Sequence, residues 1–190
     1  MKYPRFLGTK IKERFDFLQK SDFVKICKMQ RTRKVLNPPP TQSVSDQDVF
    51  EAVCLDVADH IRADLISIWF CSFDGTGIQC QRRYDKITGR FSDGQALMKE
   101  NYPNYFENIV EYNYISAPEA RTNPATRELT EDYLEPNGIL SLLDFILHEN
   151  FKPIGVICCE NRSCIRDWSE ADKSYLRSIA SLISFRFQFS

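Results

Sequence analysis

The chain has 190 residues, of which 43% are hydrophobic and 13% aromatic, and its 25 basic and 26 acidic residues leave a net charge of −1. That length suits one domain with an extension, the apolar content suffices for a packed core, and the charge balance argues against nucleic-acid and membrane-surface binding. The seven cysteines form no C-x-x-C pair, and the charged N-terminus lacks the apolar core of a signal peptide, so we expect a reduced, cytoplasmic protein without transmembrane segments.

Residues 1–36 are predicted to form a basic, helical extension. Ile11, Phe15 and Leu18 fall on one helical face. The following stretch, residues 25–34, carries five positive charges and could contact nucleic acid, anionic lipid or an acidic partner surface. Because no aromatic residues are interleaved with these charges, we favour a solvated helix.

A proline-rich linker over residues 37–44 is predicted to separate this extension from the main domain, residues 45–190. Three consecutive prolines in this stretch exclude the interior of a helix. Directly after it, Ser45 and Asp48 form a capping pattern, and apolar residues then repeat at helical spacing as far as Ile61.

A β-hairpin is predicted next. Residues 65–73 are rich in β-branched and aromatic side chains, as strands are. The sequence DGTG at 74–77 is typical of a turn, and residues 78–84 alternate between apolar and polar.

The middle of the chain, residues 85–138, has a less regular pattern. It predicts a helix over 102–112, a short strand at 114–116, and a helix from Asn123 to about Glu135.

A second hairpin and a final helix complete the predicted elements. The hairpin joins residues 139–148 to residues 153–160, and the helix begins at Ser169, capped by Asp172, and continues to about residue 187. This order favours an α+β fold: a central antiparallel sheet with the N- and C-terminal helices on one face. Loops and short helices over 97–136 would form a lid on the other face, a common way to enclose a small molecule.

The stretch from Ala120 to Asp172 resembles the second half of bacterial GAF domains, as found in sensor histidine kinases and diguanylate cyclases. The resemblance rests on the block Ala120–Pro124 and on three motifs in the family's order, which are Gly138–Asp144 (GILSLLD), Gly155–Glu160 (GVICCE) and Trp168–Asp172 (WSEAD). It covers about residues 43–187. PAS domains are the nearest structural rival, but they lack the long helices predicted here at both ends.

The resemblance implies a regulatory sensor module in signal transduction, not an enzyme. It implies a small-molecule ligand under the lid, a homodimer formed through the helices at 46–62 and 169–187, and no catalytic residue. The chain ends just after its last helix, so it is either a piece of a larger sensor or acts through a protein partner. Met1 and the charged extension favour the second.

The chain departs from the family pattern in ways that leave the ligand or cofactor unidentified. The Asn-Lys-x-Phe-Asp-Glu signature of cyclic-nucleotide GAF domains is absent, and Ile146 stands where a proline often follows the Leu-Asp pair. No cysteine lies between Cys80 and Cys158, so the lid offers no thiol to attach a bilin and lacks the cysteines of the family's methionine sulfoxide reductase.

Four residues are the candidate ligand-binding residues: Trp69, Arg121, Asp144 and Glu160. The two carboxylates interrupt apolar strands, and a buried carboxylate needs a partner. For Arg121 and Asp144 we favour an ion pair that clamps the lid to the sheet over direct ligand contact. Trp69 is either a core residue or a stacking surface.

Two other function classes stay open. A ligand-free adaptor would fill its pocket with bulky side chains and contact partners through residues 9–34. A small redox enzyme would use Cys80, Cys158 or Cys159, with a thiol of lowered pKa at a pocket rim. We expect no metal site, because the neighbouring Cys158 and Cys159 point to opposite faces of a strand, and we expect His60 to be solvated.

Overall fold

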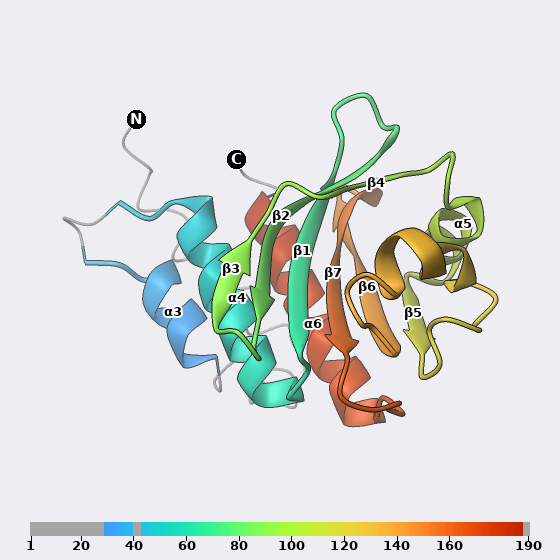
Figure 1. The fold of residues 1–190 in the computed structure, drawn as a ribbon. Coiled ribbons are helices and arrows are strands. Elements are labelled where there is room, and N and C mark those ends of the chain that lie inside the picture. Colours follow the sequence, from blue (N-terminus) through green and yellow to red (C-terminus); the bar gives the residue numbers. More distant parts are fainter. Residues whose placement is uncertain (1–28, 40–42, 188–190) are drawn as a thin grey trace.

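The computed structural model describes residues 29–39 and 43–187. The helical pattern predicted for residues 9–28 lies outside these ranges. Figure 1 shows an open sheet with helices packed on it. The helices are α3 (Gln30–Leu36), α4 (Asp46–Ile61), α5 (Pro103–Tyr112) and α6 (Glu170–Phe187).

The sheet has seven antiparallel strands in the order β3-β2-β1-β7-β6-β5, and β4 pairs separately with β2. The strands are β1 (Leu65–Cys71), β2 (Gly77–Asp85), β3 (Arg90–Ser92), β4 (Ala96–Met98), β5 (Tyr114–Ala117), β6 (Ser141–Glu149) and β7 (Lys152–Asn161). Both predicted hairpins are confirmed, and their inner strands β1 and β7 pair at the centre of the sheet.

The N- and C-terminal helices cover one face of the sheet, as the sequence predicts. Ser45 caps α4 in a capping box with Asp48, which satisfies backbone N–H groups of the first turn. The apolar faces of α4 and α6 share one buried core with alternate residues of the strands. In Figure 1 both helices lie behind the sheet.

The opposite face is covered by a lid, defined here as α5 together with residues 118–138. A second buried core lies between the lid and the sheet. The predicted range of the lid, residues 97–136, is too long. It includes β5 and the end of β4, which belong to the sheet. Strands β3 and β4 were missed, since three residues are too few for an alternating pattern to be recognised.

The predicted continuous helix from Asn123 to about Glu135 is wrong. The chain instead makes turns, a 3-10 helix at Arg127–Leu129 and a π-helical turn at Thr130–Leu134. The hydroxyl groups of Thr126 and Thr130 donate to upstream backbone carbonyls rather than facing solvent. Such side-chain bonds compete with regular helix formation.

The part of the extension that the structure describes packs on the main domain. Asp56 of α4 accepts a hydrogen bond from the backbone N–H of Thr32 at 2.8 Å and an ion pair from Arg31 at 3.2 Å. Thr32 and Met29 are buried. The described basic residues Arg31, Arg33 and Lys34 are exposed, as the prediction of a solvated basic face requires, but the opposite face of α3 is docked; the domain boundary at residue 36 stays a prediction. Within the described ranges, no helix is long and apolar enough to cross a bilayer.

Candidate functional site

Two carboxylic acids lie in the core between the sheet and the lid. Leu142 pairs with Glu160, and Asp144 pairs with Cys158, across β6 and β7. Because side chains alternate along a strand, Asp144 and Glu160 project from the same face of the sheet. Their relative exposures are 1% and 0%.

Each carboxyl group accepts one hydrogen bond from a tyrosine of the lid. Tyr105 of α5 donates its hydroxyl proton to Oδ2 of Asp144 at 2.7 Å, and Tyr133 donates to Oε1 of Glu160 at 2.6 Å. Both tyrosines are buried. The two bonds connect the lid to two neighbouring strands of the sheet, β6 through Asp144 and β7 through Glu160.

The second oxygen of each carboxyl group is unpaired. Oδ1 of Asp144 and Oε2 of Glu160 are buried and accept no hydrogen bond from the described residues. Both acids line a small cavity. The volume within it that the centre of a water molecule could occupy is about 10 Å³. That is close to the lower limit for a single water molecule.

Burial raises the pKa of both acids, because it disfavours the charged form. For Asp144, burial and the neighbouring charge of Glu160 raise the pKa to about 8, against the lowering effects of Tyr105 and Cys158. For Glu160, burial raises the pKa to about 7, against the lowering effects of Tyr133 and the charges of Arg83 and Arg162. The site therefore holds protons near neutral pH that a solvated carboxylate would release.

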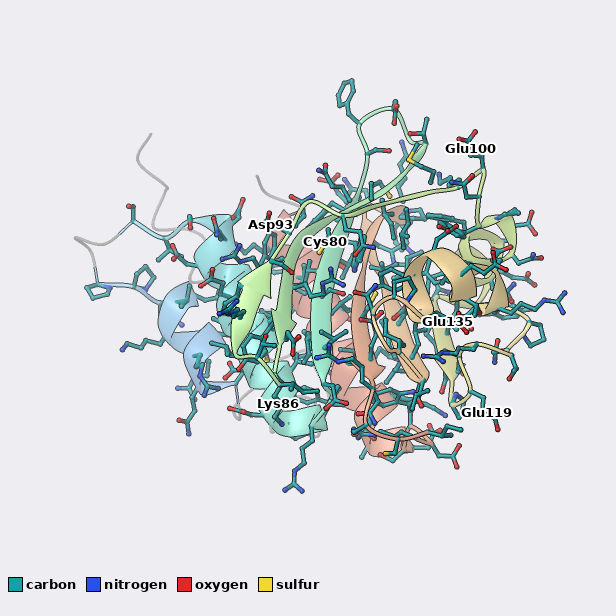
Figure 2. All side chains as sticks on the ribbon, viewed as in Figure 1. Cys80, Lys86, Asp93, Glu100, Glu119 and Glu135 are labelled. Carbon is teal, nitrogen blue, oxygen red and sulfur yellow. The ribbon has the colours of Figure 1, made fainter. Side chains whose placement is uncertain are left out.

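Large side chains fill most of the space beside the carboxyl groups. Trp69 of β1 meets the ring of Tyr133 edge to face at 5.9 Å, and its indole N–H donates to Ser67 at 2.8 Å. The remaining lining residues are Ile78, Leu97, Leu129, Leu142 and Cys158. Figure 2 shows Glu135 on the lid and Cys80 on β2 of the sheet.

Glu128 joins the two parts of the lid. Its Oε1 accepts the backbone N–H of Tyr105 at 2.7 Å, and its Oε2 accepts the side-chain amide of Asn104 at 2.8 Å. The carboxylate thus caps the first turn of α5, where backbone N–H groups lack helical partners. This contact fixes Tyr105 relative to the segment that carries Tyr133.

Three of the four predicted site residues lie together, and the fourth does not. Trp69, Asp144 and Glu160 line one cavity. Arg121 lies outside this lining and donates its Nε–H to the carbonyl of Ile139 at 2.8 Å. The predicted Arg121–Asp144 clamp is wrong: among the residues that the structure describes, the lid contacts Asp144 through a neutral phenol. Arg121 as a ligand-binding residue stays a prediction.

The lid tyrosines are the site residues that the sequence did not identify. In the sequence, Tyr105 falls within the predicted helix over 102–112 and Tyr133 within the predicted helix from Asn123 to about Glu135, without a feature that marks either as a site residue. No local pattern assigns a tyrosine to a carboxylate 39 or 27 positions away.

The cysteines have the properties of core residues. Cys158 lies in the lid-side core and Cys159 in the helix-side core, as their alternation predicts. Burial raises the pKa of Cys80 to about 12 and raises the pKa of Cys158 and Cys159 well above the ordinary value. The exposed thiol of lowered pKa that a redox enzyme needs is thus not found at these three positions.

Two further predictions concern histidine and metals. His60 is half-buried and stacks on Tyr175 with ring centroids 3.8 Å apart, so the expectation of a solvated side chain is wrong. Within the described ranges, no group of three or more His, Cys, Asp or Glu residues is arranged to hold a metal ion.

Comparisons with known proteins agree with this architecture. A family model described as GAF domain matches residues 46–187. A comparison with curated proteins finds no match.

Solved structures share the fold at low sequence identity. The GAF domain from an Acinetobacter phosphoenolpyruvate-protein phosphotransferase has a TM-score of 0.62 at 16% identity, covering 88% of this chain and 93% of that one. The corresponding domain from Coxiella burnetii has a TM-score of 0.63 at 12% identity, covering 88% and 95%. The phycocyanobilin-bound GAF domain from a cyanobacterial phytochrome has a TM-score of 0.69 at 15% identity, covering 87% and 94%.

Proposed function

The chain belongs to the GAF domain family, and from that premise we propose that it is a regulatory sensor domain that binds a small molecule between the lid and the sheet. One observation carries this proposal. Two buried acids, Asp144 and Glu160, line the same cavity, and each carboxyl group has one oxygen without a hydrogen-bond partner among the described residues. Because an unpaired buried polar group is costly, such a pair favours a bound species that forms the missing hydrogen bonds.

A ligand at this site would act on the position of the lid. Tyr105 and Tyr133 hold the lid closed through their bonds to β6 and β7. The reverse faces of these strands pack against the core of α4 and α6. Ligand binding would therefore bias the packing of the two helices, a population shift between conformations that involves no catalytic residue.

A second candidate function is a ligand-free adaptor. The observation in its favour is the small size of the cavity, since Trp69, Tyr105 and Tyr133 occupy most of the enclosed space. In an adaptor, these side chains would take the place of a ligand in the core, and the N-terminal extension would contact the partner protein.

A homodimer through α4 and α6 is also part of the proposal. Since α3 packs on α4 through Asp56, a dimer that uses α4 must accommodate or displace α3. Sedimentation velocity of the whole chain at several concentrations tests this, and a monomer at all of them would contradict it.

Native mass spectrometry, compared with the denatured mass, tests the sensor against the adaptor. A non-covalent excess mass that is released on denaturation supports the sensor and gives the mass of its ligand. A bare chain that also gains no thermal stability from a library of small metabolites supports the adaptor.

A further inference from the structure

Two phenylalanine side chains are fully exposed at one end of the sheet. Phe73 lies in the loop between β1 and β2, and Phe151 lies in the turn between β6 and β7, with relative exposures of 110% and 99%. Both loops are at the same end, because β1 and β7 are antiparallel and Phe70 near the end of β1 pairs with Gly155 near the start of β7. Figure 1 shows the β1–β2 loop projecting beyond this end. Single exposed apolar residues are ordinary, but two rings presented together by neighbouring strands indicate an interaction surface.

The backbone of Phe151 gives no structural reason for a phenylalanine. Glu149 pairs with Lys152, so Asn150 and Phe151 are the two residues of the turn. Their φ angles are 48° and 66°. Positive φ at both positions is typical of a type I′ turn, which prefers glycine where Phe151 stands, and a bulky residue is strained there. Because this ring strains its turn and lies in water, it does not stabilise the fold, which favours a functional role.

The loop that carries Phe73 is held in place by its polar residues. The backbone N–H of Gly75 donates to the carbonyl of Ser72 at 2.9 Å. Oδ1 of Asp74 accepts the backbone N–H of Thr76 at 3.1 Å and its hydroxyl group at 2.7 Å. These bonds fix the loop without using the aromatic ring, so Phe73 is already positioned for a partner. Such pre-organisation reduces the entropy that binding costs.

The charge around the two rings does not suit a membrane. Residues 72–76 and 149–152 contain two acidic residues, Asp74 and Glu149, and one basic residue, Lys152. Anionic lipid surfaces attract segments that are rich in Lys and Arg. Insertion of the two rings would therefore lack the electrostatic contribution that stable membrane anchoring requires in addition to apolar burial.

Contact between the same loops of two copies would be too small for a stable dimer. An aromatic side chain buries about 150–250 Å², so the rings from two copies would bury about 600–1,000 Å² in total. Stable protein interfaces bury about 1,200–2,000 Å². A larger partner that encloses both rings and also contacts the flanking turns reaches this area.

We propose that Phe73 and Phe151 form a docking surface for a partner protein whose cleft has two apolar pockets and a polar rim. The C-terminal part of α6 lies at the same end, since the backbone N–H of His148 donates to the hydroxyl oxygen of Ser184 at 2.9 Å. Strand β7 starts at this surface and carries Glu160 of the candidate site. The surface does not include the cavity, so the proposal goes beyond the proposed function and does not depend on a ligand.

Photocrosslinking in the cells that contain the protein naturally tests this proposal. Benzoylphenylalanine is placed at Phe73, at Phe151 or, as a control, at the exposed Ile87. Ile87 lies at the opposite end of the sheet, because it follows Asp85, which pairs with Leu65 at the start of β1. One partner protein should be crosslinked from both phenylalanine positions and not from Ile87. Crosslinks to other copies of this chain only, or to no protein, would overturn the proposal.

The partner identified in this way is then purified, and its affinity is measured by isothermal titration calorimetry. Burying an aromatic ring contributes about 10–100-fold to affinity, so Phe73→Ser and Phe151→Ser should each weaken binding by about that factor. Ile87→Ser should leave the affinity unchanged. Equal affinities of the wild type and the double variant Phe73→Ser/Phe151→Ser would contradict the proposed surface.

Phe151→Gly separates binding from folding. Glycine suits the left-handed position of the turn, so the Tm should rise by about 2–4 °C while partner binding weakens as in Phe151→Ser. A fall in the Tm would show that Phe151 stabilises the fold, against the argument from strain.

Two measurements address the other possible occupants of the surface. Flotation uses vesicles of equal parts phosphatidylcholine and phosphatidylserine, and sedimentation velocity measures self-association. The wild type and Phe73→Ser/Phe151→Ser should behave alike in both. Vesicle binding that the double variant loses would replace the partner protein by a membrane, and self-association that it loses would replace it by a second copy.

Discussion

The hydroxyl group of Tyr105 in α5 donates to Oδ2 of Asp144 in β6 at 2.7 Å, and both residues are buried. This bond joins a helix of the lid to strand β6 of the sheet. The equivalent bond from Tyr133 to Glu160, at 2.6 Å, does the same for the next strand. The closed lid therefore depends on two neutral donors that meet two buried acids.

Replacing Tyr105 by phenylalanine is expected to loosen the lid. Tyr105→Phe keeps the ring but leaves Asp144 without its donor, which should reduce the free energy of unfolding by about 1–3 kcal/mol. Urea unfolding measures this loss. The exposed Tyr112 provides the control, since Tyr112→Phe removes a hydroxyl at the surface and should leave the unfolding free energy unchanged. Equal effects of the two variants would contradict a special role for the Tyr105 bond.

Stability is expected to fall as the pH rises towards 8. The pKa of Asp144 is raised to about 8 and that of Glu160 to about 7 in the folded protein, from ordinary values of 3.8 and 4.5. Between these limits the unfolded chain releases protons that the folded chain retains. Each acid therefore lowers the free energy of unfolding by up to about 1.4 kcal/mol per pH unit across this window.

Asp144→Asn and Glu160→Gln should flatten this dependence, because neither side chain titrates. Urea unfolding at several values between about pH 5 and about pH 8 provides the comparison. Curves for the wild type and both variants that run parallel would show that the two acids titrate normally in the folded state.

Alkylation should distinguish the cysteines by their burial. Cys164 is exposed, whereas Cys54, Cys80, Cys158 and Cys159 are buried. Because the thiolate is the reactive form and burial raises the pKa of all four buried thiols, iodoacetamide should modify Cys164 well before them. Peptide mapping after timed labelling, with a denatured control, gives the order. Fast modification of Cys80, Cys158 or Cys159 in the folded protein would restore the redox-enzyme interpretation.

Asp56 is expected to hold α3 on the domain. Asp56→Ala leaves the backbone N–H of Thr32 without its acceptor, which should cost about 1–3 kcal/mol in the docking of α3. Hydrogen exchange of residues 30–36 should accelerate. Asp59→Ala is the matched control, because exposed Asp59 pairs, among the residues that the structure describes, with the side chain of Arg31 and not with the backbone of α3. Unchanged exchange in Asp56→Ala would mean that apolar packing alone docks α3.

Many elements were predictable because their signals are local. Ser45 and Asp48, which cap the start of α4, are only three residues apart in the sequence. The DGTG turn likewise joins two strands that pair directly with each other. Such patterns depend on helical or strand periods, which the sequence displays directly. The long segment from Asn123 to Glu135 was predicted less well, because threonine side chains bond the backbone there and interrupt the helix.

The acids of the candidate site could be predicted from the sequence, but their hydrogen-bond partners could not. A carboxylate inside an apolar strand stands out in the sequence, so Asp144 and Glu160 could be selected without a structure. Their partners could not be, and the sequence favoured the charge of Arg121 over a phenol. That preference failed because the path of the lid brings Tyr105 to Asp144 and directs Arg121 to the carbonyl of Ile139.

By itself, then, the sequence determined the family motifs, the two hairpins, the flanking helices and the presence of two acids in apolar strands. The tertiary structure decided which face the acids occupy, which donors reach them and how little space remains between them. These features depend on the register between β6 and β7 and on contacts across 39 and 27 residues. Strand parity and lid path are set by the packing of the whole core, and no local pattern encodes them.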